Sequence, residues 1–99
     1  MKYKNREQIF KDIWTRIEHT RVTKGIDYSG TEDVNSNFKR AAKKYNISPE
    51  KVLMIYVDKH LDAITTYVNK GHLKGEPIDE KIDDVINYMG ILLSLTKEK

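Results

Sequence analysis

The stretch SPEKVLMIYVDKHLDAITTYVNKG, residues 48–71, decides the fold. Ser48 can accept a hydrogen bond from the first turn of a helix, and Pro49 suits the first helical position, where its missing N–H is not needed. The apolar residues that follow recur at helical spacing, and Gly71 is a typical helix end. The stretch therefore predicts one long helix. Its expected buried stripe consists of Val52, Leu53, Tyr56, Leu61, Ile64 and Val68.

Three more helices are expected from similar signals. The first covers about 6–23, with Asn5 as its cap and Lys24–Gly25 at its end. The second covers about 35–45 and stops at Asn46, and the fourth follows Asp79 as its cap. Their expected buried residues are Ile9, Phe10, Ile13, Trp14 and Ile17 in the first helix, Phe38, Ala41, Ala42 and Tyr45 in the second, and Ile82, Val85, Ile86, Met89, Leu92 and Leu93 in the fourth.

These elements predict an all-α fold, a four-helix single domain over residues 1–99. Neither a convincing β-alternation nor an internal repeat is found. Long apolar stripes on so small a unit favour a homo-oligomer that buries some of them.

The composition narrows the class of protein. With 38% hydrophobic and 33% charged residues, the chain suits a soluble globular protein. It has no apolar run of about 20 residues for a membrane span, and its start, MKYKNREQ, lacks an apolar signal core. Cysteine is absent, which excludes disulfides, thiolate catalysis and cysteine-ligated zinc. A cytoplasmic protein with no membrane partner is the expectation.

The formal charge of +3 is unevenly placed along the chain. Residues 1–25 carry seven Lys or Arg against three acids, whereas residues 76–84 carry five acids against one lysine. A basic half and an acidic pole are compatible with a small anionic ligand held between them, and equally with an ordinary solvated surface. This pattern argues against a nucleic-acid partner, because the chain is not uniformly basic and has no convincing helix-turn-helix pattern.

Two acid-bearing stretches, VDKHLD (57–62) and EKIDDVINY (80–88), suggest a metal site. Residues four apart share a helical face, so antiparallel packing of the two helices could gather carboxylates around a Mg²⁺ ion. The alternative is that the acids of the second stretch favour a helix N-terminus and those of the first face water or nearby lysines. The candidate metal ligands are Asp58, Asp62, Glu80 and Asp84.

Candidate ligand-binding residues stand among these acids. Lys59 could reach a phosphate and His60 could donate to one, although partial burial in the apolar stripe also explains His60. Asn87 lies three residues after Asp84, on the same face. Lys59 and Asp84 are the candidate catalytic residues.

A second ligand-binding candidate is the predicted loop at residues 24–33 with the start of the next helix. Its glycines allow close backbone approach, and its polar and aromatic side chains could hold a base or a phosphate. An ordinary helix connection explains the same residues, and the glycine spacing matches no phosphate-binding fingerprint. The candidates are Asp27, Tyr28, Asn37 and Arg40.

The order of five short motifs is also informative: KGIDYSGTED (24–33), NFKRAA (37–42), ISPEKV (47–52), KHLDAI (59–64) and IDDVINY (82–88). Together they resemble small phage and prophage proteins related to the MazG-like all-α nucleotide pyrophosphohydrolases and to nucleotide-modification-associated domains. The resemblance covers roughly residues 20–95. It implies Mg²⁺ held by acids from two helices and cleavage of a nucleoside triphosphate to the monophosphate and pyrophosphate.

Carried over by motif, Asp84 matches the acid before the final tyrosine of the closing helix, with Glu80 one turn earlier. Asp58 and Asp62 stand where the preceding helix offers its acids. The MazG-like group usually shows a Glu-x-x-Glu pair, which this chain lacks.

Three functions follow as expectations. The first is Mg²⁺-dependent nucleoside triphosphate pyrophosphohydrolysis, in which Lys59 and Arg40 balance the phosphate charge. The second is a non-enzymatic phage anti-defence protein that sequesters a nucleotide or a cyclic nucleotide signal. The third is inhibition of a host protein by direct binding.

Overall fold

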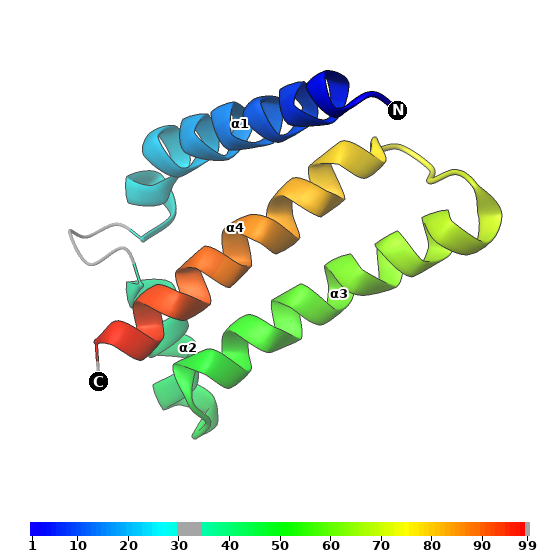
Figure 1. Cartoon of the computed structure of the whole chain (residues 1–99). Helices are drawn as coiled ribbons and strands as arrows, with labels where there is room; N and C mark the ends of the chain where they lie inside the picture. Colours follow the sequence, from blue (N-terminus) through cyan, green and yellow to red (C-terminus); the bar gives the residue numbers. More distant parts are fainter. Residues whose placement is uncertain (30–34, 99) are drawn as a thin grey trace.

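Four helices make up the part of the chain that the computed structural model describes, namely the backbone of residues 1–29 and 35–98 and the side chains of 1–22 and 35–98. They are α1 (Tyr3–Ser29), α2 (Ser36–Tyr45), α3 (Pro49–Lys70) and α4 (Ile78–Lys97) (Figure 1). No strand occurs in these ranges. The predicted all-α fold with four helices is confirmed.

The ends of α2 and α3 form by the expected local chemistry. The Lys51 amide donates to Ser48 Oγ over 3.2 Å, which caps α3, and Pro49 is its first residue. Asn46 ends α2 and Gly71 ends α3 in the left-handed conformation, with φ of 56° and 80°. In this conformation the backbone leaves the helix axis, and the amide of the residue can bond to a carbonyl of the last turn. The Gly71 amide donates to the Tyr67 carbonyl over 2.7 Å.

The predicted ends of the other two helices are wrong. The predicted cap Asn5 lies inside α1, and the expected end at Lys24–Gly25 is not one, because α1 continues to Ser29. A glycine inside a helix costs only about 1 kcal/mol relative to alanine, and no proline enforces a stop. Helix α4 begins one residue before Asp79, after Pro77, so Asp79 lies in its first turn.

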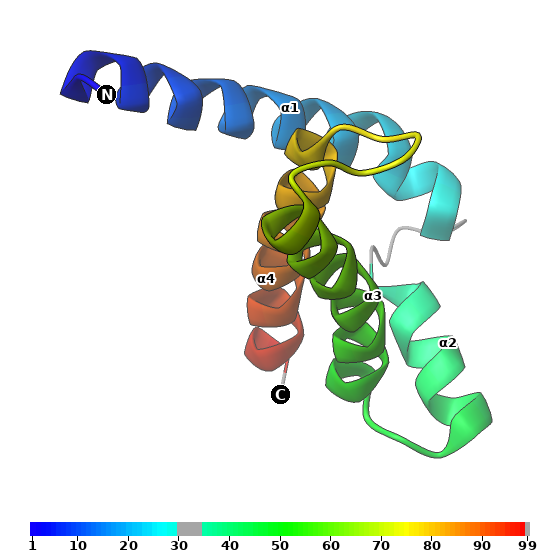
Figure 2. The same cartoon turned by 90° about the vertical axis from the view of Figure 1, so that its right-hand side faces the viewer.

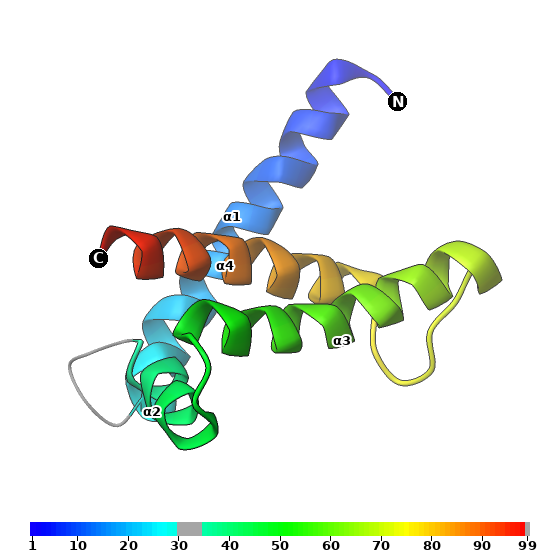
Figure 3. The same cartoon turned by 90° about the horizontal axis from the view of Figure 1, so that it is seen from below.

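Helices α3 and α4 form an antiparallel pair, and α1 and α2 pack beside it. Helix α2 lies on one flank of this pair, and α1 crosses α4 on its side away from α3 (Figures 1 and 2). The N-terminal half of α1 projects past α4 on the flank opposite α2 (Figures 2 and 3). The molecule is consequently elongated, with extents of 45 × 27 × 24 Å.

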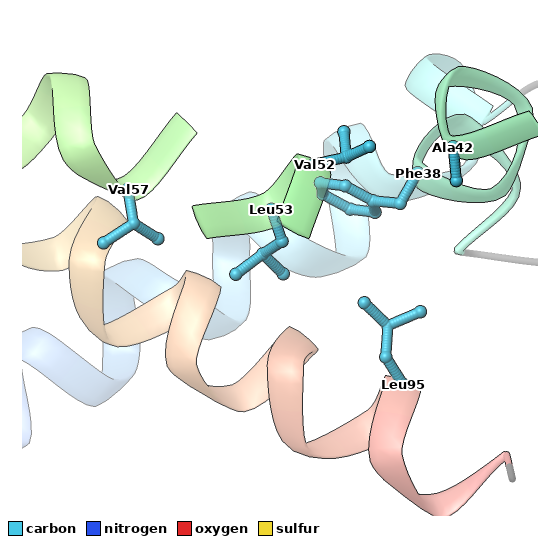
Figure 4. Packing of buried hydrophobic residues seen from close by; sticks show 6 residues of the cluster. All are labelled: Phe38, Ala42, Val52, Leu53, Val57 and Leu95. Atoms are coloured by element: carbon cyan, nitrogen blue, oxygen red, sulfur yellow. The ribbon is translucent and has the colours of Figure 1, made fainter. Parts of the chain in front are cut away.

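The core sits where α2, α3 and α4 meet. Its members are Phe38, Ala42, Val52, Leu53, Val57 and Leu95 (Figure 4). From α1, Ile13 and Ile17 are also buried. The core is small because burial requires a neighbouring element, and each helix has such a neighbour on only part of its apolar surface.

Many residues of the predicted stripes are therefore not buried. An apolar stripe identifies the face that favours burial, but it does not supply the element that covers it. The expected core residues that the structure leaves exposed are Ile9, Phe10, Trp14, Tyr45, Tyr56, Leu61, Val68, Ile82, Met89 and Leu93.

Polar contacts tie the distant helices to α4. Arg16 of α1 donates to both carboxylate oxygens of Asp83, over 2.6 and 3.0 Å, and this pairing raises the pKa of the guanidinium. The buried side chain of Asn35 donates to Ser94 Oγ and to Glu98 Oε1, each over 3.1 Å. These contacts fix both ends of α4 against the first half of the chain. Among the described residues, no helix has the length and apolar character that a membrane span requires.

Candidate functional site

A cavity of about 340 Å³ lies between α3 and α4. Helix α3 contributes two aromatic rings and a lysine, and α4 contributes a lysine and a tyrosine. The lining residues are Tyr56, Lys59, His60, Lys81 and Tyr88. Its walls therefore combine aromatic surface with positive charge.

The aromatic wall of the cavity is continuous with the core. Phe38 meets Tyr56 edge-on at 5.9 Å between ring centroids, and Tyr56 stacks on Tyr88 at 6.3 Å. His60 lies against the other side of this group, 5.4 Å from Tyr88. Such ring pairs restrict one another's orientation, so the buried Phe38 holds the wall in place.

His60 and Asp84 meet at the edge of the cavity. Nδ1 of His60 lies 3.5 Å from Oδ2 of Asp84, close enough for electrostatic attraction when the imidazole is protonated. This distance is long for a hydrogen bond, and the buried nitrogen has no hydrogen-bond partner among the described residues. Partial burial raises the pKa of Asp84, and the nearby His60 and Lys81 oppose that rise.

The two lysines of the cavity have different surroundings. Lys81 Nζ lies 2.7 Å from Glu76 Oε2; this pairing raises the pKa of the lysine and lowers the pKa of Glu76. Lys59 takes part in none of the ion pairs formed within residues 1–22 and 35–98. Its ammonium group is thus the cation of the cavity most available to a ligand.

The four predicted metal ligands do not gather at this cavity. Asp84 lies at its edge, but Asp58 lines a separate open groove of about 510 Å³ at the start of α3, beside Lys51 and Met54. Asp62 and Glu80 are exposed, and no group of three or more His, Asp or Glu within the described residues is placed to hold a metal ion. One chain alone therefore does not fit the predicted Mg²⁺ centre.

The remaining ligand-binding candidates lie elsewhere. On α2, Arg40 Nη2 donates to Asn37 Oδ1 over 2.8 Å, so these two candidates bind each other. Asn87 is half-buried on α4 and does not line the cavity. The side chains of Asp27 and Tyr28 lie outside the described residues. The structure thus brings together Lys59, His60 and Asp84 from the predicted set.

Sequence reasoning missed three residues of the cavity: Tyr56, Lys81 and Tyr88. The apolar spacing predicts that Tyr56 belongs to the core stripe, yet its side chain is exposed. The available signal was spacing, since Tyr56 precedes His60 by four residues and Tyr88 follows Asp84 by four. An aromatic side chain beside a charged one on the same helical face can line a ligand-binding cavity as well as pack in a hydrophobic core.

Comparison of the chain with protein-family models, curated proteins and solved structures gives no match. The MazG-like resemblance therefore stays a prediction. The chemistry of the cavity between α3 and α4 is what supports a function.

Proposed function

We propose that this chain is a nucleotide-binding protein whose site is the cavity between α3 and α4. The observation that carries the proposal is the composition of its wall, which joins stacked tyrosines to lysines within one cavity. A volume of about 340 Å³ is near the lower end of the roughly 300–1,000 Å³ of small-molecule sites, which suits a mononucleotide.

The aromatic residues provide a surface for the base. Tyr88 is half-buried and already stacked on Tyr56, so little ordering is required when a flat ligand binds. Stacking of a base on an aromatic side chain is worth about 1–3 kcal/mol and tolerates any base. This contact supports recognition of a nucleotide over a simple phosphate.

The basic residues provide a surface for the phosphates. Lys59 is exposed and Lys81 lies across the cavity, so an anion between them would meet two ammonium groups. Nδ1 of His60 is buried beside Asp84, and when the ring is protonated Nε2 is a donor as well, which leaves Nε2 for a phosphate. A phosphate would therefore add a favourable contact at each of three side chains.

Hydrolysis is the second candidate function, because Asp84 lies beside His60 and is a candidate catalytic residue, and the MazG-like resemblance makes it one of the acids that hold Mg²⁺. Within the described residues of one chain, the four predicted metal ligands do not come together around one point, so hydrolysis would not use them as a single Mg²⁺ centre. Sequestration of an unaltered nucleotide, or of a cyclic nucleotide signal, rests on binding alone and is the function that we favour. The setting we propose is the cytoplasm, with a phage anti-defence role as its biological context.

The test is equilibrium dialysis against a panel of nucleoside triphosphates, monophosphates and cyclic dinucleotides, with and without Mg²⁺. Chromatography of the denatured mixture then identifies the bound species. Intact nucleotide recovered from the protein supports sequestration, whereas monophosphate and pyrophosphate formed only with Mg²⁺ support the hydrolase. Absence of binding to every nucleotide overturns the proposal and leaves a host protein as the partner to seek.

Two variants connect any binding to this cavity. Lys59→Gln removes the available cation, and we expect a roughly tenfold or greater loss of affinity, as for other charged hydrogen bonds. Tyr88→Leu removes the stacking surface and keeps an apolar side chain. The matched controls are Lys43→Gln and Tyr45→Leu, which change exposed residues of α2 outside the cavity. Equal losses in variants and controls would contradict this site.

A further inference from the structure

The chain exposes more surface than a compact monomer of its size. Its accessible surface is 7758 Å², whereas a folded monomer of 11.6 kDa is expected to expose about 5,800 Å². Its radius of gyration is 15.3 Å, against about 13 Å for a compact chain of 100 residues. The excess of roughly 1,900 Å² exceeds the approximately 800 Å² that each partner buries in a stable protein–protein interface.

Part of this excess is an apolar face on the α3–α4 pair. Its residues follow a regular spacing: those on α3 are seven apart, as are two of those on α4, and all are between 38% and 74% exposed. We define the apolar face as Met54, Leu61, Val68, Ile82, Met89 and Leu93. A seven-residue repeat is typical of helices that pack side by side along their length.

The apolar face and the cavity between α3 and α4 lie on opposite flanks of this helix pair. With 3.6 residues per turn, Met54 and Leu61 fall on one side of the buried Leu53 and Val57, while Tyr56 and His60 fall on the other. On α4, Met89 points away from Asp84 in the same way. The cavity flank is that of α2, because Phe38 contacts Tyr56 there.

The projecting half of α1 extends over the flank of the apolar face (Figures 2 and 3). The α1 surface that buries Ile13 and Ile17 continues toward the N-terminus with Ile9 and Phe10, which are each 45% exposed. The exposed apolar residues of the projecting half of α1 and the apolar face therefore lie on the same flank of the molecule.

From these observations we propose that a second copy of this chain covers the apolar face. Two antiparallel α3–α4 pairs, related by a two-fold axis, pack face to face as a four-helix bundle. The projecting half of α1 from each copy reaches over the α3–α4 pair of the other. Both copies then bury Ile9 and Phe10 together with the apolar face.

Charge complementarity favours a second copy over an unrelated partner. The exposed acids Asp58 and Asp62 border the apolar face on α3, and none of the ion pairs found in the described ranges includes them. The projecting half of α1 carries exposed basic residues, Lys2, Lys4 and Arg6. A two-fold arrangement brings the basic segment of one copy to the acidic border of the other, twice over.

The test measures mass in solution by light scattering over a dilution series. We expect twice the chain mass of 11.6 kDa for the natural sequence. Leu61→Glu and Met89→Glu should each raise the dimer dissociation constant at least about a hundredfold, because each copy would bury an unpaired carboxylate. Tyr45→Glu is the control, since Tyr45 is exposed on α2 and lies outside the face.

Helicity checks that the variants are folded, because both substituted positions are already exposed and lie on the flank opposite the cavity. A second experiment mixes copies labelled with ¹⁴N and ¹⁵N and joins lysines to carboxylates with a zero-length cross-linker. Mixed-isotope links from Lys2 or Lys4 to Asp58 or Asp62 are expected. A monomeric natural chain, a dimer that both glutamate variants leave intact, or the absence of mixed-isotope links overturns the arrangement.

Discussion

Val57 and Val22 form a matched pair for measuring how much the packing of α3 on α4 contributes to stability. Val57 is 2% exposed in the core, whereas Val22 is 67% exposed on α1. The substitution Val→Ala removes two methyl groups at either position, so burial is the main difference between the two variants.

The magnitude for Val57→Ala follows from its burial. Loss of two buried methyl groups costs about 1.6 kcal/mol. A residual cavity of roughly 50 Å³ adds about 1 kcal/mol. Alanine favours a helix over valine by about 0.5 kcal/mol, which leaves a net loss of about 2 kcal/mol for Val57→Ala and a gain of up to about 0.5 kcal/mol for Val22→Ala.

The assay is urea unfolding followed by helical circular dichroism at one protein concentration, with a thermal scan beside it. For a domain of this size, Val57→Ala should lower the melting temperature by roughly 8–16 °C. Equal effects of the two variants would refute the packing described for α3 and α4, and so would a stabilised Val57→Ala.

Three further outcomes are expected. Asn35→Ala should cost about 1–3 kcal/mol in urea unfolding, because it leaves Ser94 and Glu98 without their buried donor; an unchanged midpoint would contradict this role. Asp84→Asn should raise stability at neutral pH by less than about 1 kcal/mol after solvent screening. The sign follows because burial raises the folded-state pKa of Asp84 above the ordinary 3.8, so ionisation costs stability as pH rises through that range, and the gain should vanish near pH 3. Arg16→Lys should speed amide exchange in α1 and leave α3 unchanged, since lysine lacks the two-pronged contact; a uniform change across the helices would argue against it.

The helix ends show which parts of the fold the sequence could predict. Ser48, Pro49, Asn46 and Gly71 act through contacts within a few residues, and each of these predictions is confirmed. The predicted end of α1 is wrong because Gly25 weakens a helix without preventing one. Whether the helix stops or continues at such a glycine depends on the neighbouring structure.

The candidate site shows where sequence reasoning stops. Helical spacing correctly places Lys59 beside His60, but it does not give the register of α3 against α4. That register puts Asp84 next to His60, while Asp83 is held by Arg16 from a third helix. Helical spacing alone therefore does not show which acids face one another across α3 and α4, or that Tyr88 lines the cavity with His60.

The position of Asp83 has a consequence for synthesis of the chain on the ribosome. Arg16 and Asp83 are 67 residues apart, so α1 emerges first but docks only after α4 has been made. At 5–20 residues per second that interval is roughly 3–14 s. During this time Ile13 and Ile17 have no α4 to cover them, whereas α3 and α4, being neighbours in the chain, can pair soon after they emerge. The nascent α1 is therefore the segment of this protein most exposed to chaperones and to aggregation.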